Sequence, residues 1–218
     1  MATVNIKGLN QTVIVGKIIC IGRNYAEHIK ELGNVAPDSP VLFMKPSSSI
    51  VPDGGQVVIP DYSDECHHEV ELAVLIGKGG REIAPEHALQ HVAGYGVAID
   101  LTLRDVQNEL KEKGHPWEIA KAFDTSCPLS DFVPADDVSD PQNLKLRLTV
   151  NGELRQNGNS SDMIRPVAEL IAETSSYFSL APGDILLTGT PAGVSRLCSG
   201  DQVFAEIGGV ASLQITVA

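Results

Sequence analysis

Apolar residues along this chain fall mostly in short runs that glycine and proline separate. The runs are rich in β-branched side chains, which is typical of strands. We therefore predict strands at residues 17–22, 41–45, 56–60, 70–77, 94–100, 144–150, 184–189, 202–207 and 212–217.

Two pairs of these strands are separated by turn residues. Asn151-Gly152 stands between two alternating segments, and this pair accepts the positive φ angles of a tight hairpin turn. Gly208-Gly209 separates the last two runs in the same way. We expect an antiparallel hairpin at each place.

Helical spacing is rarer. It is clearest after Pro166, where apolar side chains from Val167 to Phe178, Tyr177 included, recur on one face. Shorter helices are expected at residues 25–32, 85–92 and 104–113. The pattern therefore predicts an α+β, β-rich fold with short helices on its outside.

Length and composition favour one soluble globular domain. The chain has 218 residues, of which 43% are hydrophobic and 20% charged, enough for one sizeable core. We treat residues 1–218 as a single domain in which residues 1–16 are an N-terminal lead-in. A sequence start of MATVNIKGLNQ lacks the features of a secretory signal, and no membrane-spanning run is visible.

The net charge of −12 changes what the protein is expected to bind. Such a field repels nucleic-acid phosphates and anionic lipid headgroups, so neither nucleic acid nor membrane is an expected partner. A small anionic substrate would need a local cation, from a lysine, an arginine or a metal ion.

The spacing of the cysteines indicates the redox state of the expected cellular compartment. The chain has four, at Cys20, Cys66, Cys127 and Cys198, and no two of them form a CxxC pair. Such widely separated thiols point to a reducing compartment. We therefore expect a cytoplasmic protein.

A dense cluster of polar residues, ECHHEVELAV, begins the strand predicted at residues 70–77. In an extended chain Glu69 and Glu71 point to the same face, where two buried carboxylates would repel each other unless a cation lay between them. Oxygen ligands select a hard ion such as Mg²⁺, Mn²⁺ or Ca²⁺. Zinc is less suitable, since Cys66 and His68 share the opposite face. The alternative is that both glutamates lie on the solvent face of an edge strand.

Asp100 follows the run GYGVAID and is a candidate for a third ligand. Its face of the strand also carries Gly96 and Ala98, which would leave space for an ion and its waters. The alternative is that Asp100 caps the helix expected near Arg104.

Seven motifs in register resemble the fumarylacetoacetate hydrolase family, and in particular its short single-domain acylpyruvases and oxaloacetate decarboxylases. They extend over nearly the whole chain, from residue 17 to residue 217. The motifs are GRNYAEHIKELG, PVLFMKP, HHEVELAVLIG, GYGVAIDLTLRDVQ, PWEIAKAFDTSCPLS, VNGELRQ and GDILLTGTPAGV. The resemblance implies a roll of mixed β-sheets, a homodimer, and Mg²⁺ or Mn²⁺ held by Glu69, Glu71 and Asp100.

The resemblance also implies catalytic roles for three residues. His28 and Glu31 match a water-activating pair, and their i, i+3 spacing lets them meet on one helix face. Lys121 matches a lysine that faces substrate and metal. Taken without the family motif, residues of these types in such segments more often lie on a solvated surface, and this is the alternative for all three.

Four further positions are expected to bind the substrate. Arg23, Arg104 and Gln107 resemble substrate-contacting positions, although a helix surface explains the last two as well. Thr190 lies in the loop LTGTPAGV, which suits the presentation of a hydroxyl and an N–H group to a carboxylate, or simply a tight turn.

The expected substrate is therefore a small anionic 2-oxo acid. The main hypothesis is hydrolysis of an acylpyruvate, such as acetylpyruvate or fumarylpyruvate, with a metal ion stabilising the departing pyruvate enolate. Decarboxylation or keto–enol tautomerisation of oxaloacetate at the same site is the alternative. A non-catalytic β-rich module is a more distant one, and it would bind no metal.

Overall fold

The computed structural model describes residues 2–9, 11–33, 35 and 39–218. Its strands are β1 (Thr3–Ile6), β2 (Gln11–Ile14), β3 (Ile18–Gly22), β4 (Val41–Lys45), β5 (Ile50–Pro52), β6 (Gln56–Val57), β7 (Cys66–His67), β8 (Val70–Ile76), β9 (Val92–Ile99), β10 (Thr102–Leu103), β11 (Cys127–Leu129), β12 (Val133–Pro134), β13 (Lys145–Val150), β14 (Glu153–Asn159), β15 (Ile185–Leu187), β16 (Gln202–Ile207) and β17 (Ala211–Val217). Every run predicted as a strand contains one, although β6 covers only the start of residues 56–60.

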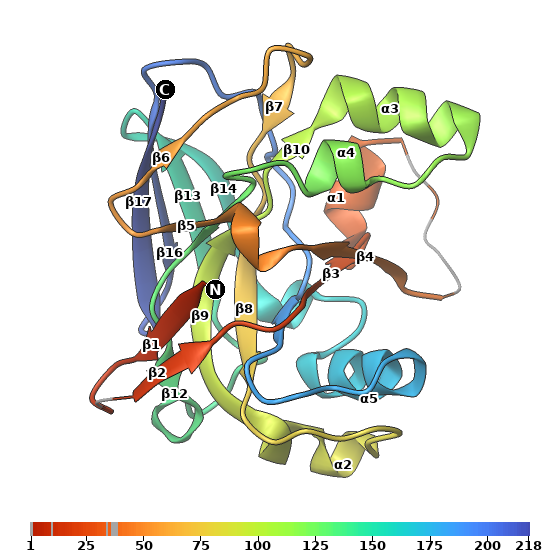
Figure 1. Ribbon diagram of the computed structural model, residues 1–218, viewed down its shortest axis with the longest axis vertical. Helices are drawn as coiled ribbons and strands as arrows, with labels where there is room; N and C mark the ends of the chain where they lie inside the picture. The colour runs from red at the N-terminus through yellow and green to blue at the C-terminus, as the bar shows by residue number, and fades with distance from the viewer. Residues whose placement is uncertain (1, 10, 34, 36–38) are drawn as a thin grey trace.

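Two main sheets organise the molecule (Figure 1). The larger has the strand order β4-β3-β15-β8-β9-β11-β5, with β12 also pairing with β9, and it mixes parallel and antiparallel neighbours. The smaller has the order β14-β13-β16-β17-β6. The expected β-rich mixed-sheet fold is therefore confirmed.

Both predicted hairpins form in the smaller sheet. Strands β13 and β14 pair through Asn151 and Gly152, whose φ angles are 52° and 80°. Strands β16 and β17 pair across the Gly208-Gly209 turn. Alternate side chains of β17 are buried and exposed, as expected where one face of a sheet packs on a core.

The larger sheet is buried on both faces, which explains why β8 reads as a nearly continuous apolar run. Leu72 and Val74 belong to the core shared with the smaller sheet, whereas Ala73 and Leu75 belong to a second core on the opposite face. Because side chains alternate, Glu69 and Glu71 extend the row of this second core. The carboxylates thus lie at the edge of an apolar interior.

The helices are short and lie outside the sheets (Figure 1). They are α1 (Ala26–Glu31), α2 (Pro85–Ala88), α3 (Arg104–Lys113), α4 (Glu118–Lys121) and α5 (Val167–Tyr177), with 3₁₀ turns at Ser47–Ser49, Leu89–His91, Ala135–Asp137 and Ser160–Asp162. Within the described chain, none of these helices has the length and apolar character needed to cross a membrane.

The sequence placed some boundaries wrongly. The helix expected to reach residue 92 ends at Ala88, because Val92 already begins β9. Phe178 lies beyond the end of α5 in extended backbone, and Tyr177 is 54% exposed instead of facing the core. Helix α4 and the β1–β2 hairpin were not predicted at all. That hairpin lies within the lead-in and adds Val4 and Ile6 to the second core.

Candidate active site

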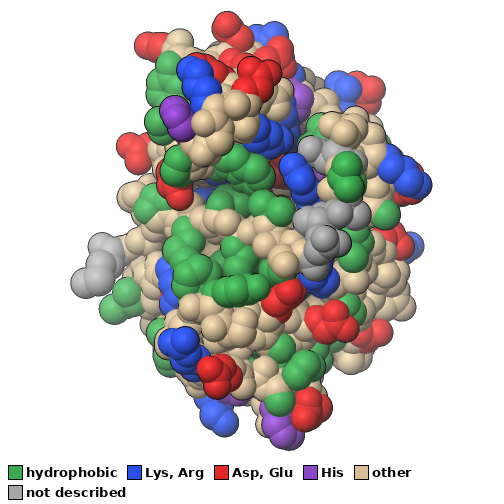
Figure 2. Space-filling model, turned by 90° about the vertical axis from the view of Figure 1, so that its right-hand side faces the viewer, with side chains coloured by type: hydrophobic (Ala, Val, Ile, Leu, Met, Phe, Trp, Pro, Cys, Tyr) green, Lys and Arg blue, Asp and Glu red, His purple; other side chains and the backbone are tan. Residues whose placement is uncertain are grey.

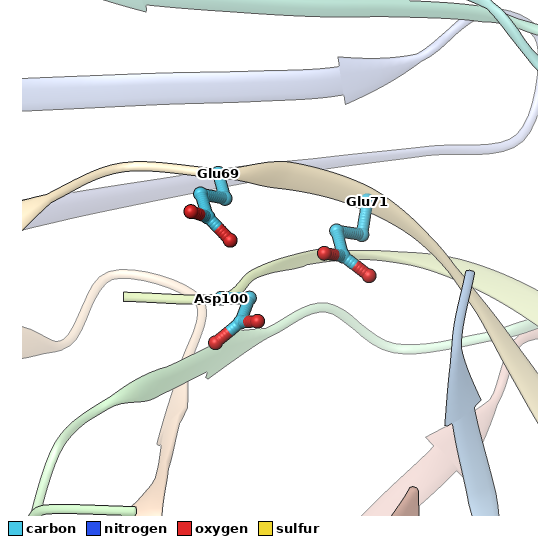
Figure 3. Close-up of side chains that lie close together, drawn as sticks. All are labelled: Glu69, Glu71 and Asp100. Carbon is cyan, nitrogen blue, oxygen red and sulfur yellow. The ribbon is translucent and has the colours of Figure 1, made fainter. Parts of the chain in front are cut away.

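Three carboxylates converge where β8 begins and β9 ends. Glu69, Glu71 and Asp100 point toward one another (Figure 3), with ligand atoms within 4.8 Å of one another. Their exposed fractions are only 5%, 2% and 1%. The N–H of Asp100 donates to the carbonyl oxygen of Glu69 at 2.8 Å, which continues the pairing of β8 with β9 and fixes the two residues opposite each other.

The surface alternatives for these residues are wrong. Strand β8 lies between β15 and β9, so Glu69 and Glu71 are not on an edge. Helix α3 has Leu103 at its N-cap and no side-chain capping bond, so Asp100 does not cap it.

Gly96 of β9 serves close packing instead of making room for an ion. A Cβ at Gly96 would lie 3.0 Å from Ser130 Oγ and 3.3 Å from the ring of Phe132, so a larger residue would collide with the neighbouring segment. The expectation that Gly96 leaves space for an ion is therefore wrong.

Cations surround two of the three carboxylates. Lys121 Nζ donates to Glu69 Oε2 at 2.8 Å and to Asp100 Oδ2 at 2.7 Å, and Arg104 pairs with the other oxygen of Glu69. Lys45 Nζ lies 2.9 Å from Asp100 Oδ1. Burial would raise the pKa of Glu69, but Lys121 and Arg104 hold that pKa well below its usual range.

Glu71 has a different environment. Its Oε2 accepts a 2.7 Å hydrogen bond from the N–H of Gly189, and none of the ion pairs seen in the described chain involves it. Burial, followed by the charges of Asp100 and Glu69, raises the pKa of Glu71 well above its usual range. Carboxylates that conflict in this way fit a hard divalent cation, which would stabilise all three in the ionised form.

The histidines and the cysteine nearby are not part of this cluster. His67 Nε2 lies 3.1 Å from Glu65 Oε2, and His68 contacts Gln156 and Ser195. Within the described chain, the acidic triad is the one group of three or more His, Cys, Asp or Glu side chains that could share an ion. All of its donors are oxygens, which agrees with the expectation against zinc.

His28 and Glu31 meet as their spacing on α1 predicts. His28 Nδ1 lies 3.1 Å from Glu31 Oε2, and Glu31 Oε1 accepts from the N–H of Gly193 at 2.9 Å. Because an ionised carboxylate can only accept a hydrogen bond, Nδ1 of His28 is the donor, and in the neutral imidazole Nε2 carries the free lone pair. His28 is 6% exposed, so it is not a surface histidine.

All of the expected substrate-binding residues line one pocket with the triad and His28. Arg104 and Gln107 are buried and are joined by a 2.7 Å hydrogen bond, so the helix-surface alternative is wrong for both. Lys121, at 3% exposure, is not a surface lysine either. Arg23 and Thr190 complete the expected set. The pocket's empty volume is about 410 Å³, open solvent at its mouth included.

The sequence analysis missed several groups around the pocket. Lys111 and Trp117 line it, and Lys111 Nζ lies 5.4 Å from the centroid of the Trp117 ring. Lys45 forms an ion pair with Asp100. Lys45 and Trp117 stand within the motifs PVLFMKP and PWEIAKAFD, which was the only signal available for them. Figure 2 shows Lys and Arg side chains gathered in the upper half of the face that carries the helices, although the chain as a whole is acidic.

The sequence matches the family described as "Fumarylacetoacetate (FAA) hydrolase C-terminal" over residues 17–218. The chain belongs to the fumarylacetoacetate hydrolase family. This confirms the resemblance carried by the seven motifs.

Named relatives share most of their length with the chain. "Oxaloacetate tautomerase YcgM" of Escherichia coli K12 is 53% identical over 89% of this chain and 90% of its own. "Oxaloacetate tautomerase FAHD1, mitochondrial" of Bos taurus is 49% identical over 92% and 90%. A fumarylpyruvate hydrolase of Pseudomonas aeruginosa, solved with Mn²⁺ and pyruvate, has a TM-score of 0.96 at 39% identity and covers 100% of this chain and 95% of its own.

Proposed function

We propose that the protein is a Mg²⁺- or Mn²⁺-dependent enzyme that interconverts the keto and enol forms of oxaloacetate. The observation that carries this proposal is the closed arrangement of three buried carboxylates beside cationic side chains in one pocket. The names of the relatives with 49% and 53% identity support the choice of substrate. Binding of small anionic 2-oxo acids follows from the same cations.

Glu69, Glu71 and Asp100 would hold the metal ion through carboxylate oxygens. Once bound, the ion would supply Lewis-acid activation of the 2-oxo group and compensation for the negative charge that develops on its oxygen when C3 loses a proton. The choice between Mg²⁺ and Mn²⁺ is part of the proposal.

The chain's own cations would bind and orient the substrate. Arg104 and Lys121 provide positive charge for its carboxylate and for the enolate oxygen, and Gln107 and Thr190 add neutral hydrogen-bonding groups. Burial would lower the pKa of Lys121, but Asp100 and Glu69 raise it, so this lysine remains protonated. Arg23 and Lys111 extend the positive field toward the mouth of the pocket.

His28 would move the proton. Glu31 fixes Nε2 as the basic nitrogen, which in tautomerisation would take a proton from C3 of the keto form and pass it to the 2-oxygen to give the enol, and the reverse transfer would restore the keto form. The reaction needs no water molecule and breaks no carbon–carbon bond. It is therefore the least demanding reaction for this set of residues.

Hydrolysis of acylpyruvates is the second candidate, and the His28–Glu31 pair favours it. A base held in this way can deprotonate a water molecule for attack on the distal carbonyl carbon, after which the pyruvate enolate departs. The fumarylpyruvate hydrolase of the same fold supports this activity. Decarboxylation of oxaloacetate would need the same enolate stabilisation.

A panel assay tests the proposal. The assay would follow four reactions: tautomerisation and decarboxylation of oxaloacetate, and cleavage of acetylpyruvate and of fumarylpyruvate. Each would be measured with Mn²⁺, with Mg²⁺ and after EDTA treatment. We expect metal-dependent turnover, with tautomerisation the fastest reaction. A non-catalytic β-rich module would be inactive in every assay.

The wider organisation belongs to the same proposal. We propose one catalytic domain over residues 1–218, a homodimer, and a cytoplasmic location like that expected from the sequence. Several relatives carry the word "mitochondrial" in their names, so the location needs its own measurement.

A further inference from the structure

Gln156, the last residue of the motif VNGELRQ, is a fully buried residue of β14 beside the pocket. Its side-chain amide makes four hydrogen bonds. The oxygen Oε1 contacts Val70 N at 3.0 Å and His68 Nδ1 at 2.9 Å, and the nitrogen Nε2 contacts Thr190 Oγ1 at 2.8 Å and Pro191 O at 2.9 Å. An amide has two acceptor sites and two donor hydrogens, so the group is saturated.

Two backbone groups fix the orientation of this amide. The N–H of Val70 can only donate, so the atom facing it must be the oxygen of Gln156. The carbonyl of Pro191 can only accept, so the atom facing it must be the nitrogen. The orientation therefore does not depend on how a side-chain proton is placed.

This orientation determines the direction of the hydrogen bond at Thr190. Because Gln156 donates to Oγ1, Thr190 accepts there, and its hydroxyl hydrogen remains for another acceptor. The remaining contact within hydrogen-bonding range in the described chain is Pro191 O at 3.5 Å, at the limit of such a bond, and that oxygen already accepts from Gln156. Thr190 lines the pocket, so its hydroxyl can donate to an anion there.

We propose that Gln156 is a positioning residue that makes Thr190 a hydrogen-bond donor to the carboxylate of the bound 2-oxo acid. The proposal rests on the proposed function, because it concerns the same pocket and the same class of substrate. Gln156 also ties the loop of Thr190 to Val70, the residue between Glu69 and Glu71. It thus fixes the anion-binding loop relative to the strand that carries two of the carboxylates.

Pyruvate binding at saturating Mn²⁺ tests the proposal by calorimetry. The variants are T190V, Q156E, Q156M and the two double variants, with T190S to restore the hydroxyl and S195A as the matched control. Ser195 contacts the far nitrogen of His68 and leaves Gln156 untouched. The Mn²⁺ affinity of every variant is measured separately, as a readout of the neighbouring metal centre.

The proposal predicts strong coupling between the two positions. T190V should weaken pyruvate binding about 10- to 100-fold, the loss expected for a hydrogen bond to a charged group. Q156E should do the same, since its carboxylate would draw the Thr190 hydroxyl toward itself, and Q156M should do so because the hydroxyl would turn to Pro191. In the T190V background, neither Q156E nor Q156M should weaken pyruvate binding by more than a further factor of about two. T190S and S195A should bind like the native chain, and Mn²⁺ affinity should change little.

Other outcomes separate the two proposals. The role of Gln156 would be overturned if the losses of pyruvate affinity in the single variants multiplied in the double variants. It would also be overturned if Q156E bound pyruvate normally. In either case the proposed function would stand. Failure of the native chain to bind pyruvate with Mn²⁺ would remove both.

A measurement on the native chain remains decisive if the Gln156 variants do not fold. The orientation of the amide requires a proton on Nδ1 of His68, so the imidazole ¹⁵N shift of that atom should be of the protonated type. A free lone pair on Nδ1 would place the nitrogen of Gln156 against His68 and would overturn the proposal.

Discussion

Lys121 donates a 2.7 Å hydrogen bond from Nζ to Oδ2 of Asp100, and both side chains are almost completely buried. The same ammonium group contacts Glu69 at 2.8 Å. The chain thus supplies a counter-ion to its own acidic cluster. This ion pair explains how the carboxylates can be buried without a metal ion, and it places a cation in the pocket proposed to bind the substrate.

Replacement of Lys121 by methionine should therefore act most strongly on the metal-free protein. Removing one partner of a buried ion pair costs about 3 kcal/mol of unfolding free energy or more. Mn²⁺ should recover much of this loss, because it supplies positive charge to the same oxygens. Urea unfolding with and without Mn²⁺ measures both values, with K30M, at an exposed pair, as the control. An equal loss in both conditions would show that lysine and metal do not share these carboxylates.

Replacement of His28 by alanine should separate acylpyruvate hydrolysis from oxaloacetate decarboxylation. Acylpyruvate hydrolysis should fall about 100-fold or more in kcat, because its water molecule loses a general base. Decarboxylation of oxaloacetate should fall much less, since it needs no water. K30A on the same helix is the control. Equal losses for both substrates would refute this division of roles.

Glu31 should affect the rate of hydrolysis through its hydrogen bond with His28. Glu31→Gln keeps the size of the side chain but removes the charge that holds the Nδ1 proton, so we expect about a tenfold loss of hydrolysis. The rates of hydrolysis by E31Q, by H28A and by the double variant check this. In the H28A background the change at Glu31 should have almost no further effect.

Lys111 should give substrate binding a pH dependence. Burial, followed by the charges of Arg104, Arg23 and Lys121, lowers the pKa of Lys111 from 10.5 to about 8. The KM for oxaloacetate should therefore rise as pH increases from 7 to 9, because this cation is lost. K111R should remove that rise, since arginine stays charged, and K111M should give a high KM throughout. A native KM that is constant over this range would contradict the role.

Deprotonation of Lys111 should weaken substrate binding as pH rises, but it should increase the stability of the fold. Below about pH 8 Lys111 is charged in both the folded and the unfolded chain, and its burial costs stability. Between about pH 8 and 10.5 the unfolded chain holds a proton that the folded chain has lost, so the contribution of Lys111 to unfolding free energy rises with pH. K111M should lack this rise in pH-dependent urea unfolding.

The carboxylate triad was predictable because strand periodicity determines which side chains share a face. Glu69, just before β8, and Glu71 within it are two residues apart, so an extended chain places them on the same face, while the pattern left open whether that face is buried or lies on an exposed edge. Asp100 was a candidate from its place after the run GYGVAID, and the family motifs then favoured it as a ligand over a helix cap. What the pattern could not provide was the sheet order, which makes β8 a central strand and brings Asp100 opposite Glu69.

The residues that were missed are placed by the tertiary fold, and the hydrophobic pattern around them gives no sign of it. Gln156 stands in ELRQNGN, a polar strand of a hairpin, and it is buried only because it reaches the strand of the carboxylates. Lys111 stands in the charged segment ELKEK and reads as part of the solvated face of α3. The hairpin of β1 and β2 consists of two four-residue strands, too short for a clear alternation.

Calorimetric titration of the metal-stripped protein with Mn²⁺ tests the central claim most directly. The variants E71Q and D100N remove ligands with little change of shape, and E65Q, an exposed glutamate near the same strand, is the matched control. We predict a single saturable site in the native chain and in E65Q, and its loss in E71Q and D100N. Absence of saturable binding in the native chain, or native-like binding in D100N, would contradict the claim that these carboxylates hold a metal ion.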